Sequence, residues 1–480
     1  MPMPGSGANG HSANGHSVNG QLSFPPGFTW GSASAAYQIE GATTADGRGT
    51  SVWDTFAHAP GNVRGGDTGD IACDAYHRFR EDVALMASLG LNAYRFSVSW
   101  PRVQPGGRGA ANQKGLDYYR QLLDELAAHD IAGALTLYHW DLPQELQDDG
   151  GWAARDTALR FADYASLVAD ALGDRVRQWI TLNEPQVVAS HGYRSGEHAP
   201  GLHDPAAARA ATHHLLLAHG LATSAIRTAV SCAPVGITLD LHPVRLLGDA
   251  RPDVLYKAAR ITDADLNGLF LEPVLKGRYP EGASEALLPP DGLIEAGDMA
   301  VIGQRIDFLG VNYYSSAYLR AGDPDDLRRH ESRPRCGLPG VVEFSPDWLE
   351  RTAMNWLVDA DGLYELLVRL SKDAPGLALF ITENGCAAED YVNPEGLVND
   401  PERVRYLQQH LAAAARAIDD GVNLAGYYVW SLLDNFEWGW GYQKRFGIVF
   451  VDYGTQRRIP KASARFYSDV IRANAVPALP

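Results

Sequence analysis

Two glutamates follow apolar runs of the same form and are the candidate catalytic groups of this sequence. Glu184 closes the run "ITLNEP", and Glu383 closes the run "FITENG". If both runs are strands of one closed barrel, both carboxyl groups lie on the same rim. Two carboxyl groups about 5–5.5 Å apart can cleave a glycosidic bond with retention, one as nucleophile and the other as acid/base. Two solvated loop glutamates are the alternative, and the repeated strand-end context favours the catalytic pair.

Polar residues near other strand ends suggest different roles for the two carboxyl groups. Arg95 and Tyr314 are natural partners for an ionised nucleophile, because charge pairing and hydrogen bonding stabilise a carboxylate. Glu184 has no such cation beside it in the pattern and can keep the raised pKa that an acid needs. Asn183 can share a sugar with Glu184 only if the strand end twists or bulges there, because adjacent strand residues point to opposite faces. A structural ion pair in the barrel mouth is the alternative for Arg95.

Tryptophans gather at or just after the predicted strand ends. They are Trp140, Trp430, Trp438 and Trp440. An indole can cover the apolar C–H face of a pyranose, while the sugar hydroxyls need polar partners at the ring edge. Glu437 beside Trp438 supplies both kinds of contact. A single Trp is more often part of a core, but the stretch "WSLLDNFEWGWGYQKRFG" carries too many polar residues for a core.

Eight β-like runs alternate with amphipathic helical patterns from Phe24 onward, and these elements must position the candidate residues. The runs are "FTWGSASAAYQ", "NAYRFSVSW", "IAGALTLYHW", "RQWITLNEP", "VGITLDLH", "IDFLGVNYY", "LALFITENG" and "NLAGYYVWSLLD". Helical periodicity is clear over Phe79–Gly90 and Gly115–Asp130. The alternation predicts an α/β fold, a single (β/α)8 TIM barrel over residues 23–480, although a doubly wound sheet fits the same alternation. Polar residues at the C-terminal end of each run favour the barrel, whose active sites are built there.

Composition limits the partners and the location of the chain. The net charge of −17 over 480 residues argues against nucleic acid and anionic membranes as partners. The four cysteines show no CxxC spacing, which favours a reduced protein without disulfides. The Gly/Ser/Asn-rich residues 1–22 do not resemble a secretory signal and are expected to form a disordered, low-complexity tail. No apolar run approaches the roughly 20 residues that span a bilayer. A cytoplasmic location is therefore expected, and the oligomeric state cannot be predicted.

Seven motifs in a fixed order resemble those of glycoside hydrolase family 1, the β-glucosidases and their relatives. They are "FTWGSASAAYQIEGA", "YRFSVSWPR", "TLYHWDLP", "TLNEP", "VNYYS", "ITENG" and "WSLLDNFEWGWGYQKRFG". The resemblance extends from about Phe24 to Tyr467. It implies a retaining double displacement on a terminal β-D-glucosyl residue of a small β-glycoside or oligosaccharide, with Glu184 as acid/base, Glu383 as nucleophile and no cofactor.

The resemblance also implies which residues surround the substrate. Those holding the glycone, the sugar that is transferred, would be Gln38, His139, Asn183, Glu437 and Trp438, with Trp430 beneath the ring. Asn312 and Tyr314 would support the nucleophile. Trp356 would line the aglycone side, where the leaving group binds.

Two departures from the family pattern concern that aglycone side. The residues around Trp356 differ from the usual "GWEIYPEGL", since Asn355, Leu357 and Ala360 replace Gly, Glu and Pro. Gln186 stands where many relatives carry Trp after "TLNEP". These differences affect the predicted leaving-group preference and leave the chemistry unchanged.

Three other functions fit parts of the pattern. A non-catalytic homologue would be expected to lack one glutamate, and a myrosinase-like thioglucosidase would carry Gln in place of Glu184. A metal-dependent hydrolase would need ligands among the clustered histidines, which are His191, His198, His203, His213 and His214. No HExxH or comparable spacing places them as ligands, so loop and helix-surface positions are the better interpretation and no metal is expected.

Overall fold

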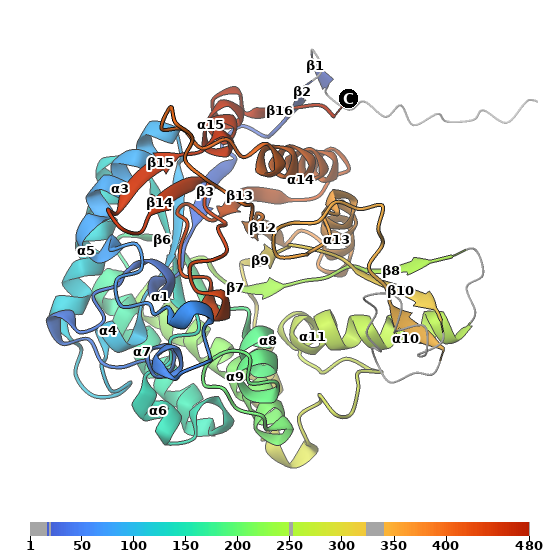
Figure 1. Cartoon of the computed structure of the whole chain (residues 1–480). Helices are drawn as coiled ribbons and strands as arrows, with labels where there is room; N and C mark the ends of the chain where they lie inside the picture. Colours follow the sequence, from blue (N-terminus) through green and yellow to red (C-terminus); the bar gives the residue numbers. More distant parts are fainter. Residues whose placement is uncertain (1–16, 19–20, 249–252, 323–339, 480) are drawn as a thin grey trace, which may run out of the picture.

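Eight parallel strands close into a barrel at the centre of the computed structural model (Figure 1). Around the barrel the order is β12-β13-β3-β4-β5-β6-β7-β9, so the chain visits neighbouring positions in sequence. The strands are β3 (Thr29–Ala33), β4 (Ala93–Ser97), β5 (Ala132–Tyr138), β6 (Val176–Asn183), β7 (Val235–Asp240), β9 (Phe308–Asn312), β12 (Ala378–Asn384) and β13 (Leu424–Trp430). Seven lie within the predicted runs, and β6 begins at Val176, one residue before its run. Closure confirms the predicted barrel and excludes the doubly wound sheet.

Helices cover the outside of the barrel (Figure 1). The longer ones are α3 (Ala75–Leu89), α5 (Gln113–Ala128), α7 (Arg155–Leu172), α9 (Pro205–Ala229), α10 (Asp253–Asp263), α11 (Leu269–Lys276), α13 (Ala360–Asp373), α14 (Pro401–Asp419) and α15 (Ala462–Ala473). Short helices in the connections are α1 (Ala36–Ile39), α2 (Val52–His58), α4 (Trp100–Val103), α6 (Gln144–Asp148), α8 (Pro185–Val187) and α12 (Asp298–Ile302). The predicted helix that ended at Gly90 is α3, and Gly90 has the positive φ of 82° that suits a helix C-terminus.

Side chains fill the lower part of the barrel and form a floor beneath its C-terminal rim. Small residues such as Ala93 and Ala134 alternate with the larger Phe308, Phe380 and Tyr428 in one apolar cluster. Small and large side chains from neighbouring strands can interdigitate without voids. The barrel is therefore a packed core, and only its C-terminal end can hold a polar site.

Three small sheets lie outside the barrel and were not predicted from the sequence. They are β1 (Ser17–Val18), β2 (Gln21–Ser23) and β16 (Ala475–Pro477); β8 (Val244–Leu247), β10 (Ala317–Ala321) and β11 (Val341–Glu343); and the pair β14 (Val449–Asp452) and β15 (Arg457–Pro460). β8, β10 and β11 belong to the connections after β7 and β9, and they lie beside α10 at the right of Figure 1. Each strand is too short to give a clear periodic pattern in the sequence.

The structure describes residues 17–18, 21–248, 253–322 and 340–479. Most of the tail predicted over 1–22 lies outside these ranges. Gln21 and Leu22, which the prediction assigned to that tail, instead pair with β16, because backbone hydrogen bonding to a neighbouring strand does not require large apolar side chains. Three cysteines within the described ranges are free, and Cys336 lies outside them.

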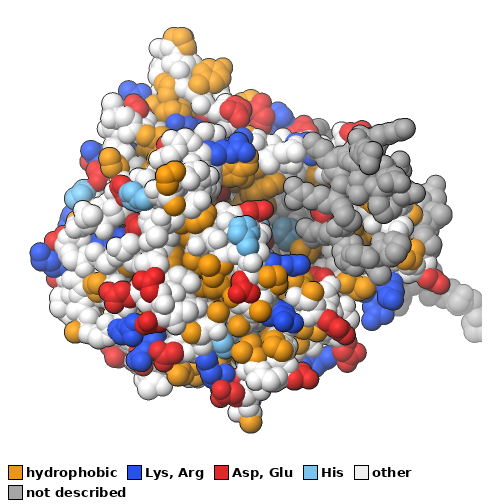
Figure 2. All heavy atoms as spheres, turned by 60° about the horizontal axis from the view of Figure 1, so that its bottom comes forward, with side chains coloured by type: hydrophobic (Ala, Val, Ile, Leu, Met, Phe, Trp, Pro, Cys, Tyr) orange, Lys and Arg blue, Asp and Glu red, His pale blue; other side chains and the backbone are white. Residues whose placement is uncertain are grey.

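Two further properties bear on possible partners. Over the described ranges, every helix is too short or too polar to cross a bilayer. Figure 2 shows acidic and basic side chains interspersed over one face of the molecule, so the acidic excess is not gathered into one patch on that face.

Candidate active site

The end of β6, where Asn183 and Glu184 lie, departs from regular strand geometry. Ile180 pairs with Gly236 on β7 and Asn183 pairs with Thr238, so three steps on β6 match two on β7. Glu184 then adopts a left-handed conformation, with φ 47°. The bulge precedes Asn183, so the left-handed backbone at Glu184 is what breaks the strand alternation between these two residues.

Glu383 occupies a second bulge, at the end of β12, and two donors hold its carboxyl group. The register against β9 shifts between Ile381 and Glu383. Arg95 donates from Nη1 to Oε1 over 2.5 Å, and the Tyr314 hydroxyl donates to Oε2 over 2.7 Å. Both predicted partners of Glu383 are therefore in contact with it. Charge pairing and hydrogen bonding at both oxygens favour the ionised form of this carboxyl group.

Asn312 connects the two halves of the site. Its Nδ2 donates to Glu184 Oε1 over 2.6 Å and to Asn183 Oδ1 over 3.1 Å. Its side chain also opposes the rise in the pKa of Glu383, in keeping with the support that the resemblance implied. Thr382 fixes this orientation by donating to Asn312 Oδ1 over 2.8 Å. The same amide nitrogen reaches both side chains, so Asn183 and Glu184 face the barrel mouth together.

The two glutamates have different electrostatic surroundings. Burial, followed by the charges of Glu383 and Asp240, raises the pKa of Glu184 well above its usual value, and only the neutral amide of Asn312 hydrogen-bonds to it directly. Burial also raises the pKa of Glu383, but Arg95 and Tyr314 oppose that rise. The order of the two pKa values therefore favours a protonated Glu184 beside an ionised Glu383.

Three predicted glycone residues are buried and keep unpaired polar atoms. These atoms are Gln38 Oε1, His139 Nδ1 and Glu437 Oε2. Gln38 is fixed from its other end, where Nε2 donates to the carbonyl of Phe436 over 2.8 Å. Burial, then the charge of Glu383, raises the pKa of Glu437 to about 8. Buried polar atoms without partners are costly in a folded protein, so this cluster is suited to a ligand rich in hydroxyl groups.

Histidine and tryptophan rings form one wall of the same space. The His139 ring lies 5.8 Å from Trp430 and 6.0 Å from Trp438 between ring centroids, roughly parallel to each. Trp140 also packs on Trp438, at 4.5 Å. The structure therefore brings Trp430 and Trp438 together beside His139, as a wall that can cover an apolar sugar face.

Trp356 packs beside Tyr314, the residue whose hydroxyl donates to Glu383. Its ring packs 5.3 Å from that of Tyr314 and 5.8 Å from that of Phe446. The Trp356 side chain is half-buried, so part of it remains open to solvent. The unusual residues around it leave this aromatic contact intact.

Comparison with known proteins agrees with the geometry of this site. Residues 20–476 match the model of the family described as "Glycosyl hydrolase family 1". The thermostable beta-glucosidase B of Thermobispora bispora is 52% identical over 459 residues, which cover 95% of this chain and 92% of that protein. The bifunctional beta-D-glucosidase/beta-D-fucosidase of Bifidobacterium breve is 45% identical, with 93% and 97% covered.

A solved structure shows the same architecture. The family 1 β-glucosidase from Thermotoga maritima superposes with a TM-score of 0.88 at 44% identity, covering 95% of this chain and 99% of that one. The same enzyme in complex with deoxynojirimycin gives a TM-score of 0.86, with 94% and 99% covered. The chain belongs to glycosyl hydrolase family 1. It is therefore a glycoside hydrolase with a TIM-barrel fold.

The clustered histidines of this family 1 enzyme do not converge on one point. His213 on α9 contacts Tyr279 and Asp298, and His214 contacts the carbonyl of Trp152. Over the described ranges, no group of three or more His, Cys, Asp or Glu side chains is arranged to hold a metal ion. The interpretation of His213 and His214 as helix-surface residues was wrong in one respect, because both are buried between elements.

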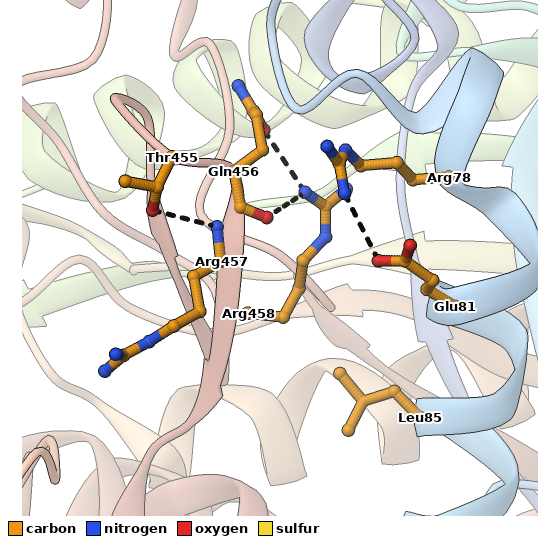
Figure 3. Close-up of a pocket in the computed structure, with 7 residues that line it drawn as sticks. All are labelled: Arg78, Glu81, Leu85, Thr455, Gln456, Arg457 and Arg458. Atoms are coloured by element: carbon orange, nitrogen blue, oxygen red, sulfur yellow. Dashed lines mark hydrogen bonds and ion pairs between the residues drawn. The ribbon is translucent and has the colours of Figure 1, made fainter.

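A surface pocket away from the barrel rim has a different character. It lies between α3 and the β14–β15 pair, and it is lined by Arg78, Glu81, Leu85 and residues 455–458 (Figure 3). Arg78 pairs with Glu81, and Arg458 donates to Gln456. These charged side chains are paired within the protein, so the barrel rim is the better candidate for the active site.

Sequence reasoning missed several residues that shape the rim. Asn435 accepts a hydrogen bond from Gln38 Nε2 over 3.1 Å, and Thr382 orients Asn312. Asp240, at the end of β7, lies close enough to Glu184 to raise its pKa. A rule that every strand-end polar residue is a candidate would have included Asp240. Thr382 gives no such signal, because it reads as an ordinary buried strand residue.

Proposed function

We propose that this enzyme is a retaining β-glucosidase, which releases terminal non-reducing β-D-glucosyl residues by double displacement. The observation that carries the proposal is the unequal environment of the two rim carboxyl groups. Glu383 is held by Arg95 and Tyr314, whereas Glu184 is held by a neutral amide. One group is thus prepared to be a nucleophile and the other an acid.

In the first step, the Glu383 carboxylate attacks the anomeric carbon while the bond from that carbon to the leaving oxygen breaks. Glu184 gives its proton to that oxygen, so the aglycone departs as a neutral alcohol. The product is an ester between the sugar and Glu383. Glu184, now ionised, takes a proton from a water molecule, whose oxygen bonds to the anomeric carbon while the ester bond to Glu383 breaks. The sugar leaves with an anomeric hydroxyl group, Glu383 is again a carboxylate and Glu184 is again protonated.

Other residues at the rim stabilise charge or position the sugar. Asn183 Oδ1 accepts from Arg95 Nη2 over 2.6 Å, and its Nδ2 donates to His139 Nε2 over 3.1 Å. This leaves one amide hydrogen of Asn183 for the sugar 2-hydroxyl, a contact that strengthens in the oxocarbenium-like transition state. The acceptors Gln38 Oε1 and Glu437 Oε2 suit the other hydroxyl groups.

Glucose as the transferred sugar is supported by the relatives. Proteins 45–52% identical to this chain are named β-glucosidases, and one of them is also named a fucosidase. The solved relative binds deoxynojirimycin. We therefore expect the glucosyl residue to be the principal substrate.

Azide rescue tests the assignment of the two roles. Glu383→Ala should abolish turnover, and azide should restore it while giving the α-glycosyl azide, because the anion fills the space of the lost nucleophile. Glu184→Ala should still form the glycosyl-enzyme from an activated aryl glucoside, and azide should then give the β-glycosyl azide. Exchange of the two product configurations between the variants would reverse the roles.

A further inference from the structure

Two buried threonines on different strands meet inside the barrel, and we call them the threonine pair. They are Thr238 on β7 and Thr382 on β12, the two neighbours of β9 in the barrel. Thr238 Oγ1 donates to Thr382 Oγ1 over 3.3 Å, and Thr382 Oγ1 donates to Asn312 Oδ1 over 2.8 Å. Each of the three residues is at most 1% exposed, so these hydrogen bonds are shielded from water.

Gly310 on β9 provides the space in which the threonine pair meets. A Cβ atom at this position would lie 2.3 Å from Thr238 Oγ1 and 2.9 Å from Thr382 Oγ1. Both distances are too short for a carbon atom, so any side chain at Gly310 would push the two hydroxyl groups apart. The contact between β7 and β12 therefore depends on a glycine in the strand between them.

The threonine pair determines which way the Asn312 amide faces. A hydroxyl group has one hydrogen, and Thr382 uses it on Asn312 Oδ1 while it accepts from Thr238. With Oδ1 held there, Nδ2 of Asn312 is turned toward Glu184 Oε1, 2.6 Å away. Half a turn of the amide would exchange the two atoms and place an acceptor beside Glu184. The pair thus selects the orientation in which Glu184 receives a donor.

A donor at Glu184 favours the ionised form of its carboxyl group. Burial and the charges of Glu383 and Asp240 raise the pKa of Glu184, and the hydrogen bond from Asn312 opposes that rise. The charged and titratable groups that act on Glu184 or are acted on by it are Glu383 on β12, Asp240 on β7, Arg95 on β4 and Tyr314 after β9. Glu184 is needed in its ionised form for the second step, in which it takes a proton from water.

We infer that the threonine pair positions the Asn312 amide for the second step of the reaction, the hydrolysis of the glycosyl-enzyme. Thr382 acts on Glu184 through Asn312, and Thr238 acts through Thr382, so both are positioning residues. The inference rests on the proposed double displacement. It assigns a role to two buried strand residues whose side chains otherwise resemble ordinary core.

Kinetics on 2,4-dinitrophenyl β-glucoside test this role. Its leaving group departs without a proton, so the second step limits kcat, while kcat/KM reports the first step. Thr382→Val replaces the hydroxyl group with a methyl group of similar size. We expect kcat to fall about tenfold, the effect of one lost hydrogen bond, and kcat/KM to change much less. A burst of dinitrophenolate should precede the slower turnover. Thr382→Ser keeps the hydroxyl group and should restore most of kcat.

Azide and pH give readouts that a general loss of structure would not change. Azide attacks the glycosyl-enzyme without needing a base, so it should raise kcat of Thr382→Val more than that of wild type. On methyl β-glucoside, whose leaving group needs the proton, the alkaline limb of the kcat/KM profile of Thr382→Val should move to higher pH. Loss of the oriented donor favours protonated Glu184, which raises its pKa.

A matched control is available on β5. Thr136 is a buried threonine whose Oγ1 has no hydrogen-bond partner among the described residues, and Thr136→Val should change none of these measurements. Thr238→Val should give the pattern of Thr382→Val with smaller changes. Melting temperatures show which variants are folded, and Thr238→Val decides if Thr382→Val is not.

The outcomes separate the threonine pair from the proposed function. Equal losses in kcat and kcat/KM without rescue by azide, or no loss in either, would overturn the inference. Wild type should form a covalent adduct with 2-deoxy-2-fluoro-β-glucosyl fluoride, detectable by mass spectrometry. Absence of that adduct would contradict the proposed double displacement itself, and the inference with it.

Discussion

Arg95 and Glu383 form a buried ion pair, with Nη1 and Oε1 2.5 Å apart and both side chains no more than 4% exposed. The same guanidinium donates to Asn183 from its other nitrogen. A planar group with two donors thus fixes the angle between the carboxylate of β12 and the amide of β6. The pair therefore also holds Asn183 and Glu383, which lie on the two sides of the proposed catalytic centre, in a fixed arrangement.

Removing this cation should change the pH dependence of the enzyme. Arg95 lowers the pKa of Glu383, so in Arg95→Met that pKa rises and the nucleophile is ionised only at higher pH. We expect the acid limb of the kcat/KM profile to move up by at least about one pH unit, with a loss of about a hundredfold at neutral pH. Arg95→Lys keeps the positive charge but loses the paired guanidinium donors. This variant should lose activity with a smaller shift of the acid limb. An unmoved acid limb in Arg95→Met would contradict the role of Arg95.

The alkaline limb of the same profile should belong to Glu184. Glu184 must be protonated to act as an acid, so activity falls as pH rises through its raised pKa. Glu184→Ala, assayed on an aryl glucoside whose leaving group needs no protonation, should lose that limb. Retention of an identical alkaline limb in this variant would assign it to another group.

The barrel could be predicted because its strands carry two signals at once. Runs such as "FITENG" are apolar over their length and polar at their end, and the helices between them have clear periodicity. The same strand-end signal selected Glu184, Glu383 and Arg95, which the structure joins in one hydrogen-bond network. A local sequence pattern is enough to predict these residues, because the barrel geometry itself brings distant strand ends together.

Other parts of the site could not be predicted, because they depend on the positions of individual atoms and not only on residue types. The sequence required a twist or bulge at this strand end, without showing that Glu184 itself takes the left-handed conformation. The direction of the Asn312 amide is set by Thr382, which lies on another strand. Gln186, in the segment after β6, donates to the carbonyl of Asp240 at the end of β7, 54 positions later in the sequence. The periodicity of apolar residues in the sequence does not reveal such contacts.

Metal removal should leave the enzyme unaffected. His213 and His214 contact groups within the protein, and the two carboxyl groups of the proposed mechanism supply both the nucleophile and the proton. EDTA should therefore not change kcat/KM on an aryl glucoside. A large loss that added metal reverses would favour a metal-dependent hydrolysis instead.

Lys461 should be needed for stability. Its ammonium group is fully buried and lies 2.6 Å from both Asp390 and Asp434. Asp434 begins the segment that carries Glu437. Lys461→Met leaves two buried carboxylates short of a cation, and we expect a loss of about 3–5 kcal/mol in the free energy of unfolding. Lys372→Met, at an exposed position of α13, is the control and should change the melting temperature little.

A phosphate at the sugar C6 should block cleavage. The resemblance places Glu437 and Trp438 near the C4 and C6 hydroxyl groups, and Trp438 cannot move aside easily because Tyr37, Trp53 and Trp140 pack against its ring. Burial favours the neutral form of Glu437, so steric exclusion contributes more than charge repulsion does.

Two cations near this loop, Arg64 from the segment after α2 and Lys444 from the loop itself, are already engaged. Arg64 lies over the Trp440 ring at 3.6 Å, and Lys444 donates to the carbonyl of Ala353 over 2.6 Å. A dianionic phosphate would therefore be desolvated without gaining a charged partner from either side chain.

We expect kcat/KM for an aryl β-glucoside to exceed that for its 6-phosphate by at least about a hundredfold, roughly 2.7 kcal/mol in transition-state binding. The two substrates should be measured side by side, with Trp438→Ser as a variant that opens the space near C6. If wild type cleaves the 6-phosphate equally well, Trp438 does not exclude it and the assignment of this end of the site is wrong.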